Sequence, residues 1–414
     1  MKHMASRVSL RSIITASVLA TPLVLAILVP ILLAQSVDYR DSDFFSFWLA
    51  SKLVLHGLSP YSQSTWILGH DVAGAAWISD STFLYPLPLA ILLAPLGALR
   101  LSDAFFAWLI LSVLITICSV IWISRSGRHT PWNLTLPLLA AVFVFRPTLG
   151  SLINGQVSAL LLGLTTLALM LFRSRKSLAG GVALSFLLLK PSLGMPIVVI
   201  AGVWFLVAKR WAAIAGVCLG GLILLTVGCV VNPRWVHELS MIGSAKLEAS
   251  IGYSPTLWGL FGMFAGESSR YYLPLGLTAS IILGACVVAY CQRLPYEGME
   301  DMALSAVVAG SLLVTPYLWT YDLLLLVAPM TVLVSLSHRS YPYLLLVAAP
   351  LAFSVVSLVL LKVAEVIGRD TWSLLLAGVI LVLILVLGSR RSTRFSFAAQ
   401  QLADADPAGG RESG

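Results

Sequence analysis

The chain has 414 residues, of which 59% are hydrophobic and only 11% are charged. A soluble domain carries roughly 25% charged residues, so this composition excludes a soluble globular protein. Long apolar runs recur from end to end and predict an all-α, polytopic membrane protein. The net charge of +8 does not indicate nucleic acid as a partner, because Lys and Arg stand mostly in short clusters between apolar runs.

The apolar runs predict about twelve membrane spans, since each span needs about 20 apolar residues. The first run, residues 13–34, is longer than a signal-peptide core, so we expect an uncleaved anchor. Residues 83–99 contain Pro86, Pro88 and Pro95, which favour a broken or half-inserted helix. If this run crosses the bilayer, the count becomes thirteen. The other candidates are residues 104–123, 133–149, 156–172, 178–190 with 195–208, 212–231, 271–290, 302–316 with 321–336, 341–361 and 371–388.

Basic clusters orient these spans, because cytoplasmic loops carry an excess of Lys and Arg. We expect both termini in the cytoplasm, and the protein in the plasma or inner membrane. Two polar segments then lie outside, namely residues 35–82, which we expect to include short surface helices, and residues 232–270. Residues 1–390 form one membrane domain, and residues 391–414 are expected to be a cytoplasmic, disordered tail. The clusters assigned to the cytoplasm are Arg125/Arg128, Arg173/Arg175/Lys176, Lys209/Arg210, His338/Arg339 and Arg390/Arg391/Arg394.

Asp41 and Asp43 stand where the first span ends, directly before the aromatic residues Phe44, Phe47 and Trp48. A carboxylate that is partly shielded by aromatic rings can accept a proton from a hydroxyl group. Both are therefore candidate catalytic bases, and Asp43 is nearer to the apolar wall. Acidic residues also favour helix starts, so a solvated acidic loop is the alternative. The two carboxylates are also compatible with a Mg²⁺ or Mn²⁺ site. No Cys or His spacing is typical of zinc, and we predict no cofactor.

Other polar residues interrupt the apolar runs on the same predicted outer side. Lys190 is followed by a helix-breaking proline and can either snorkel to the headgroups or contact a lipid-linked phosphate. Arg146 can bind phosphate bidentately. The amides of Asn154 and Gln156 can pair with sugar hydroxyls, or can belong to an ordinary polar turn.

A late stretch, Thr315–Asp322, combines aromatic residues with a carboxylate at the start of an apolar run. Trp319 and Tyr321 are either interface-belt aromatics or substrate contacts. Asp322 can cap a helix, orient a cation or position a substrate hydroxyl, and Tyr85 is a further candidate for substrate binding. Because five separate segments bring polar residues to one predicted face, and such residues are costly at membrane depth, we expect one site there.

Several short motifs, in this order, resemble glycosyltransferase family 87, whose members have the GT-C architecture. The resemblance covers roughly residues 13–336. Each motif is weak alone, but their order and spacing together are moderately specific. The motifs are Asp43 followed by aromatics, Gly57…Pro60-Tyr61, Phe83-Leu84-Tyr85-Pro86, Asn154-Gly155-Gln156, Leu189-Lys190-Pro191 and Thr315-Pro316…Trp319.

This resemblance implies an inverting sugar transfer on the extracytoplasmic side, from a polyprenyl-phosphate-linked hexose, typically mannose, to a glycolipid or glycan acceptor. It implies that Asp43 is the catalytic aspartate and that membrane lipids surround the site. The chain departs from some members after Trp319, where Thr320, Tyr321 and Asp322 stand in place of a histidine pair.

The alternative function is a transporter or lipid flippase, because about twelve spans with broken helices suit that class as well. A transporter binds its substrate near the bilayer midplane and shows internal repeats, whereas this sequence contains no convincing repeat. The enzyme predicts a cavity at one end of the bundle with a groove for a lipid, and the transporter predicts a central path.

Overall fold

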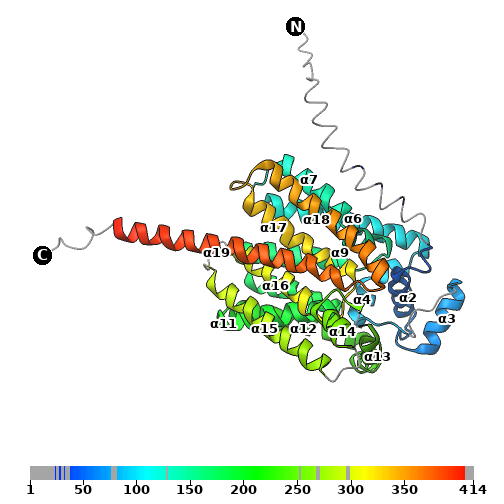
Figure 1. The fold of residues 1–414 in the computed structure, drawn as a ribbon. Coiled ribbons are helices and arrows are strands. Elements are labelled where there is room, and N and C mark those ends of the chain that lie inside the picture. Colours follow the sequence, from blue (N-terminus) through cyan, green and yellow to red (C-terminus); the bar gives the residue numbers. More distant parts are fainter. Residues whose placement is uncertain are drawn as a thin grey trace, which may run out of the picture.

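The computed structural model describes residues 38–75, 82–126, 129–250, 253–266, 271–294 and 299–405, together with Val24, Leu28 and Leu32. Within these ranges the elements are helices and no strand occurs, as the composition predicts. The expected first span, residues 13–34, lies outside the described residues apart from those three positions. Most of the long helices lie side by side in one bundle (Figure 1).

Six described helical segments are long and apolar enough to cross a membrane, or seven if a bent pair of helices counts as one span. The chain is therefore a multi-pass membrane protein, while the count of twelve or thirteen is not confirmed. The bent pair is α7 (Trp132–Val144) with α8 (Arg146–Ile153), which meet at 60°. The six segments are α6 (Leu101–Arg125), α12 (Trp211–Val231), α15 (Tyr272–Arg293), Thr320–Ser337, α18 (Tyr343–Ile367) and Thr371–Ser389.

Helices break where the prolines and polar residues predict. Residues 83–99 form two short helices, α4 (Leu87–Leu92) and α5 (Ala94–Gly97), instead of a straight span. Lys190 separates the 3₁₀ helix η1 (Phe186–Leu189) from α11 (Pro191–Val207). The same arrangement recurs between α16 and α17, with the 3₁₀ helix η3 between them. The core elements not yet given with their bounds are α9 (Ser158–Arg173), α10 (Ser177–Ser185), α16 (Glu300–Val314), η3 (Thr320–Leu326) and α17 (Val327–Ser337).

The two polar segments assigned to the outer side gather at one end of the bundle (Figure 1). The first contains α2 (Asp43–Leu55) and α3 (Gln63–Ala73), which confirms the expected short helices. The second contains α13 (Trp235–Ser250) and α14 (Leu257–Ala265). We call this end of the molecule the site end.

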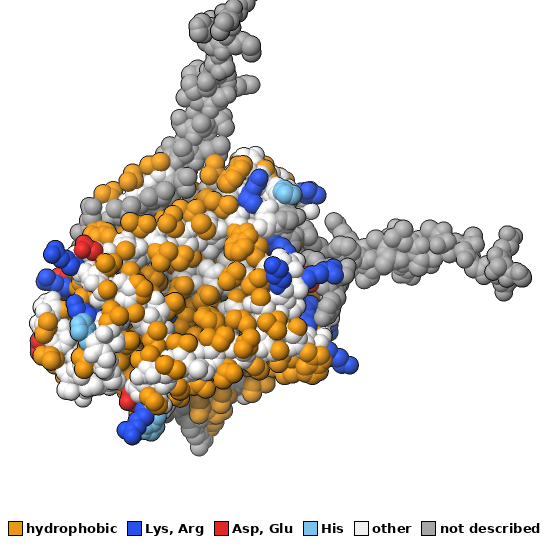
Figure 2. All heavy atoms as spheres, turned by 180° about the vertical axis from the view of Figure 1, so that it is seen from behind, with side chains coloured by type: hydrophobic (Ala, Val, Ile, Leu, Met, Phe, Trp, Pro, Cys, Tyr) orange, Lys and Arg blue, Asp and Glu red, His pale blue; other side chains and the backbone are white. Residues whose placement is uncertain are grey.

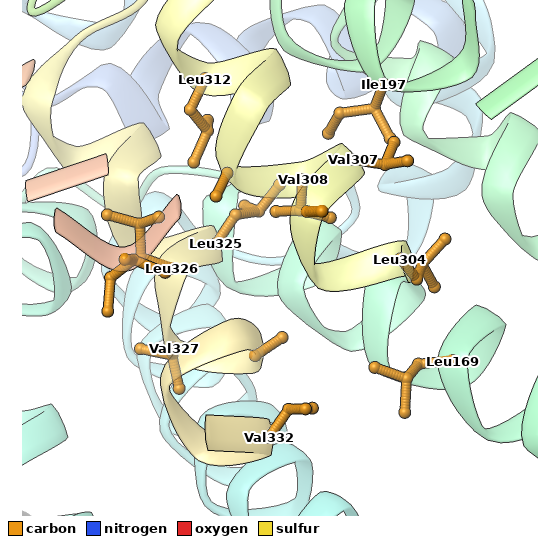
Figure 3. Packing of buried hydrophobic residues seen from close by; sticks show 14 of the residues in the cluster. Leu169, Ile197, Leu304, Val307, Val308, Leu312, Leu325, Leu326, Val327 and Val332 are labelled. Carbon is orange, nitrogen blue, oxygen red and sulfur yellow. The ribbon is translucent and has the colours of Figure 1, made fainter. Parts of the chain in front are cut away.

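The helix α16 forms the centre of the bundle, because each of its residues from Asp301 to Val314 is buried. Figure 3 shows its side chains packed against those of α9, α11 and α17. By contrast, α12, α15 and α18 expose large apolar side chains such as Leu222, Ile281 and Val359, as expected for helices that face lipid. Figure 2 shows apolar side chains across the middle of one face and charged side chains at its two ends.

An ion pair fastens the end of the bundle opposite the site end. Arg173 at the end of α9 pairs with Asp301 at the start of α16, with 2.6 Å between Nη2 and Oδ2. The same guanidinium donates to the carbonyl of Ser126 after α6. The basic ends of α6 and α9 therefore lie together, at the end of the bundle away from the polar site residues.

The last helix, α19 (Leu374–Ala405), continues without interruption past the membrane segment, so residues 391–405 are helical in this structure. The reason is local, because this stretch contains Ala, Gln, Leu and Arg, which favour helix. The cytoplasmic, disordered tail stays a prediction. Residues 406–414 lie outside the described residues.

Glycines allow α10 and α12 to approach closely. A Cβ added at Gly216 would overlap the carbonyl oxygen of Leu178, and one added at Gly181 would overlap the carbonyl oxygen of Ala213. Small residues that let helix backbones meet are typical of membrane helix interfaces.

We therefore expect Gly216→Ala to lower the free energy of unfolding by about 1–3 kcal/mol, the usual range for overpacking. Thermal unfolding of the detergent-solubilised protein measures the change. Gly221→Ala, on the same helix, is the matched control, because nothing lies within 4 Å of an added Cβ there. Equal unfolding temperatures for the two variants would contradict this account of the helix contact.

Candidate active site

Asp43 is the first residue of α2, where a carboxylate is stabilised by the helix dipole. The aromatic residues that follow it anchor the helix. The ring of Phe44 lies 5.6 Å from that of Phe105 and 6.4 Å from that of Trp108, both on α6. Asp43 is half-buried and lines a cavity, whereas Asp41 is exposed and is absent from the cavity wall.

The turn Asn154-Gly155 docks on the start of α2. The backbone N–H of Phe44 donates to the carbonyl of Asn154 at 3.0 Å, and the indole N–H of Trp108 donates to the carbonyl of Gly155 at 2.9 Å. Gly155 has φ of +61°, and an added Cβ would lie 2.5 Å from Cβ of Phe44. Only glycine combines this left-handed backbone with so close an approach, so the motif brings the next residue to Asp43.

That next residue, Gln156, bridges two charges. Its Nε2 donates to Oδ2 of Asp43 at 2.7 Å, and its Oε1 accepts from Nζ of Lys190 at 3.5 Å. Opposite charges on the two sides determine which way the amide points. Gln156 is only 1% exposed and is absent from the cavity wall, so it contacts the charged residues instead of offering its amide to a ligand in the cavity.

Lys190 does not snorkel to the headgroups. Its Nζ lies 2.6 Å from Oδ1 of Asp322, and the two side chains are 5% and 0% exposed. Asp322 also accepts from Oγ of Ser158 at 2.7 Å and from the backbone N–H of Trp319 at 3.2 Å. The carboxylate is thus a counterion of Lys190 and a cap of η3, two of the roles that the sequence left open.

Two tyrosine rings complete the surroundings of the Lys190 ammonium. Nζ lies 4.9 Å from the ring centroid of Tyr321 and 5.9 Å from that of Tyr85, which is the range of cation–π attraction. Burial raises the pKa of the Tyr85 phenol well above its usual value, and the neighbouring charges of Asp43 and Asp322 raise it further. Tyr85 is therefore a neutral hydroxyl group that can donate a hydrogen bond.

The first outer segment holds Tyr85 in place. The hydroxyl of Tyr61 donates to the carbonyl of Tyr85 at 2.7 Å, and the backbone N–H of Phe83 donates to the carbonyl of Pro60 at 3.2 Å. The rings of Phe47 and Tyr85 pack at 4.9 Å. The Pro60-Tyr61 motif and the Phe83–Pro86 motif therefore contact each other and together hold Tyr85 in place.

A cavity of about 980 Å³ joins these residues. Its polar end brings together five of the predicted site residues, namely Asp43, Tyr85, Lys190, Trp319 and Tyr321. The rest of the wall is mainly apolar, with hydroxyl groups at Ser46, Thr82, Ser192 and Ser280, and belongs mainly to α11 and α15. Its main apolar residues are Met195, Val199, Ile200, Val203, Leu277, Ile281, Ala285 and Val288.

This apolar part of the cavity reaches the surface of the bundle. Met195, Val199, Leu277 and Ile281 line the cavity and are also exposed. Because α11 rises about 1.5 Å per residue, the wall between Pro191 and Val203 is about 18 Å long. The cavity is therefore a groove along apolar helices that ends at a charged site.

Besides Asp41, two predicted residues lie away from the cavity. Both amino groups of the Arg146 guanidinium donate to Asp370, at 2.8 and 2.9 Å. Asn154 donates its Nδ2 to the carbonyl of Gly150. Neither residue is part of the cavity wall. Asp370 precedes the last membrane segment by a single residue, and nothing in the sequence signals that it faces α8.

The sequence reasoning missed Ser158 and Tyr317. Ser158 stands two residues after Gln156, at the start of α9, and only its contact with Asp322 reveals its role. Tyr317, which lines the cavity, belongs to the same late stretch as Trp319 and could have been chosen with it. In the described part of the chain, no group of three or more His, Cys, Asp or Glu side chains could hold a metal ion.

An apolar helical bundle with a charged site at the end of a lipid-facing groove fits an enzyme that acts at a membrane surface. The family model of glycosyltransferase family 87 matches residues 83–316, which is more than half of the chain. The chain therefore belongs to glycosyltransferase family 87 and is a membrane glycosyltransferase. The matched residues include Tyr85, Gln156 and Lys190, whereas Asp43 precedes them. Searches of curated proteins and of solved structures found no match.

The Lys190–Asp322 pair generates a stability prediction. Asp322→Asn leaves a buried ammonium group without a counterion, which typically costs about 3–5 kcal/mol. We expect a lower unfolding temperature in detergent. The double variant Lys190→Met, Asp322→Leu should recover part of the loss, because an apolar pair often replaces a buried ion pair without penalty.

Asp370→Asn is the comparison, since it breaks the pair with Arg146, in which each side chain is 17% exposed. Water that reaches this pair weakens its interaction, so the loss should be smaller than in Asp322→Asn. A variant Asp322→Asn that is as stable as the unchanged protein would show that Lys190 has another counterion.

Proposed function

We propose that this glycosyltransferase transfers a hexose, with mannose as the expected sugar, from a polyprenyl-phosphate donor to a lipid or glycan acceptor. The observation that carries the proposal is a single cavity that joins a carboxylate, Asp43, a buried ammonium group, Lys190, and an apolar groove between α11 and α15. Membership of the family supports sugar transfer.

The groove suits the lipid part of the donor. A prenyl chain has no polar group, so it gains free energy from an apolar wall and from contact with the surrounding lipid. The wall along α11 is long enough for several isoprene units and opens between apolar side chains that face the membrane. The chain of the donor would lie there while its phosphate reaches the polar end.

Lys190 suits the phosphate. It is the ammonium group of the cavity wall, and its charge is held at a fixed point by Asp322 and Gln156. A lysine binds phosphate as a point charge. The same charge compensates the second negative charge that develops on the phosphate as it leaves. Arg146, the other candidate for this role, is engaged by Asp370 and is not proposed as a phosphate ligand.

Asp43 is proposed as the general base. The hydroxyl of the acceptor transfers its proton to the Asp43 carboxylate while its oxygen attacks the anomeric carbon. The bond between that carbon and the phosphate oxygen breaks, and its electron pair leaves with the polyprenyl phosphate. Attack from the face opposite the phosphate inverts the configuration of the sugar. The aromatic rings of Tyr85, Trp319 and Tyr321 line the space in which the sugar would lie.

The orientation in the cell is also a proposal. Basic residues end α6 and α9 at the end of the bundle opposite the site, which supports a cytoplasmic position for that end by the positive-inside rule. The cavity then faces the extracytoplasmic side of the plasma or inner membrane. The arrangement of about twelve spans in a GT-C architecture, with both termini in the cytoplasm, belongs to the same proposal.

Asp43→Asn should abolish sugar transfer, because the amide keeps the shape of the carboxylate but cannot accept the proton. A loss of at least about 100-fold is expected for the removal of a general base. Purified full-length protein is assayed with a panel of radiolabelled polyprenyl-phosphate sugars and membrane lipids as acceptors. Asp71→Asn is the matched control, since Asp71 is exposed on α3 and lies outside the cavity wall. Full activity in Asp43→Asn would rule out the proposed base.

Lys190→Ala should raise the apparent KM for the donor by about 10- to 100-fold, the range for losing a charged hydrogen bond. The apparent KM for the acceptor should change much less, which separates a phosphate contact from general damage. Because the variant leaves Asp322 buried without its partner, unfolding temperatures are compared as well. An unchanged KM for the donor in a folded variant would refute the phosphate contact.

A further inference from the structure

Gln156 is the residue that connects the two charged groups of the cavity, although it does not line the cavity itself. Its amide is almost fully buried, and burying a polar group costs free energy unless its hydrogen bonds are made. Both ends of this amide meet charged partners. The hydrogen bonds of this buried amide therefore connect the Asp43 carboxylate to the Lys190 ammonium group.

We infer that Gln156 is a positioning residue of the transfer reaction, which holds the Asp43 carboxylate in the orientation that meets the acceptor hydroxyl and at a fixed separation from the Lys190 ammonium. The inference rests on the proposed function, because it assigns Gln156 a task only if Asp43 is the base. It replaces the expectation that the Gln156 amide pairs with sugar hydroxyls.

The backbone around Gln156 supports this role. Its N–H donates to the carbonyl of Ser151 at 2.8 Å, which closes the turn at the end of α8. The same turn is fastened to α2 through Phe44 and to α6 through Trp108. The side chain of Gln156 therefore starts from a backbone that is tied to the element carrying Asp43. A side chain that orients another side chain needs such a rigidly held backbone.

The amide also has an electrostatic effect. An N–H that donates to a carboxylate favours its ionised form, which is the form that a general base needs. Titratable groups near Asp43 include Lys190 beyond the amide, Tyr85 before α4 and Tyr321 in η3, with Tyr317 and Asp322 beside these tyrosines. Phenols ionise near pH 10 even when exposed, so the tyrosines stay neutral in the pH range of the experiment.

The test uses two variants that change the amide in different ways. Gln156→Met removes the donor and keeps the approximate size, whereas Gln156→Glu also adds a negative charge beside Asp43. Loss of the donor should move the protonation midpoint of Asp43 to higher pH. A second carboxylate should move it further, by about one pH unit or more, since two neighbouring carboxylates resist joint ionisation. Gln292→Glu is the control, because its amide contacts the carbonyl of Trp204 near the end of α11 and neither residue lines the cavity.

Infrared difference spectra of the full-length protein, recorded against pH, measure this midpoint without any substrate. The band of the protonated Asp43 carboxyl group is assigned by its absence in Asp43→Asn. We expect the midpoint to rise in the order unchanged protein, Gln156→Met, Gln156→Glu, and to stay constant in Gln292→Glu. Identical midpoints in the unchanged protein and in both Gln156 variants would overturn the inference.

Activity provides the second measurement. The acid limb of the transfer rate should move to higher pH together with the midpoint, and the maximal rate should fall by about 10- to 100-fold in Gln156→Met. A lower rate with an unchanged pH profile in both variants would indicate a purely structural role and would also overturn the inference.

The two measurements separate this inference from the proposed function. If Asp43→Asn remains active, the base assignment fails, and the inference fails with it. If Asp43→Asn is inactive and the pH profile of Gln156→Glu does not move, the proposed function stands and only the positioning role is lost.

Discussion

A buried ammonium group must have an opposite charge beside it, and this constraint organises the site. Lys190 is placed in the apolar bundle by the break before α11, where it would be costly without Asp322 at 2.6 Å. Asp322 in turn accepts hydrogen bonds from Ser158 and from the start of η3. The pair therefore connects the break before α11, the start of α9 and the start of η3. The helix breaks are thus part of the site.

The same point connects the bundle to the outer segment. Gln156 reaches from Lys190 to Asp43, and the turn before it is docked on α2 by Phe44. The polar end of the cavity thus depends on contacts among segments far apart in the chain, while its apolar part is formed mainly by α11 and α15. For a lipid-linked donor, this division would separate the binding of the tail from the chemistry at the phosphate.

Much of the fold was predictable because its signals are local. Runs of about 20 apolar residues predict helices in a membrane, and prolines predicted the breaks between α4 and α5 and before α11. The membership of Asp43, Lys190 and Tyr321 in one cavity was expected from the topology, since basic clusters and polar interruptions alternate along the chain. The helical conformation of residues 391–405 was not predicted, although Ala, Gln and Leu in this stretch favour helix.

By itself, the sequence determined that the chain is a helical membrane protein, that its helices break near Pro95 and before Pro191, and which polar residues interrupt its apolar runs. These follow from hydrophobicity and backbone chemistry, which act within a few residues. The 60° bend between α7 and α8, inside the predicted span 133–149, appears only in the structure. Only the tertiary structure decided which partner each polar residue has: Asp322 for Lys190, Asp370 for Arg146 and Asp43 for Gln156. The physical reason is that a charge can pair with any opposite charge that packing brings within about 3 Å, and packing depends on the whole bundle.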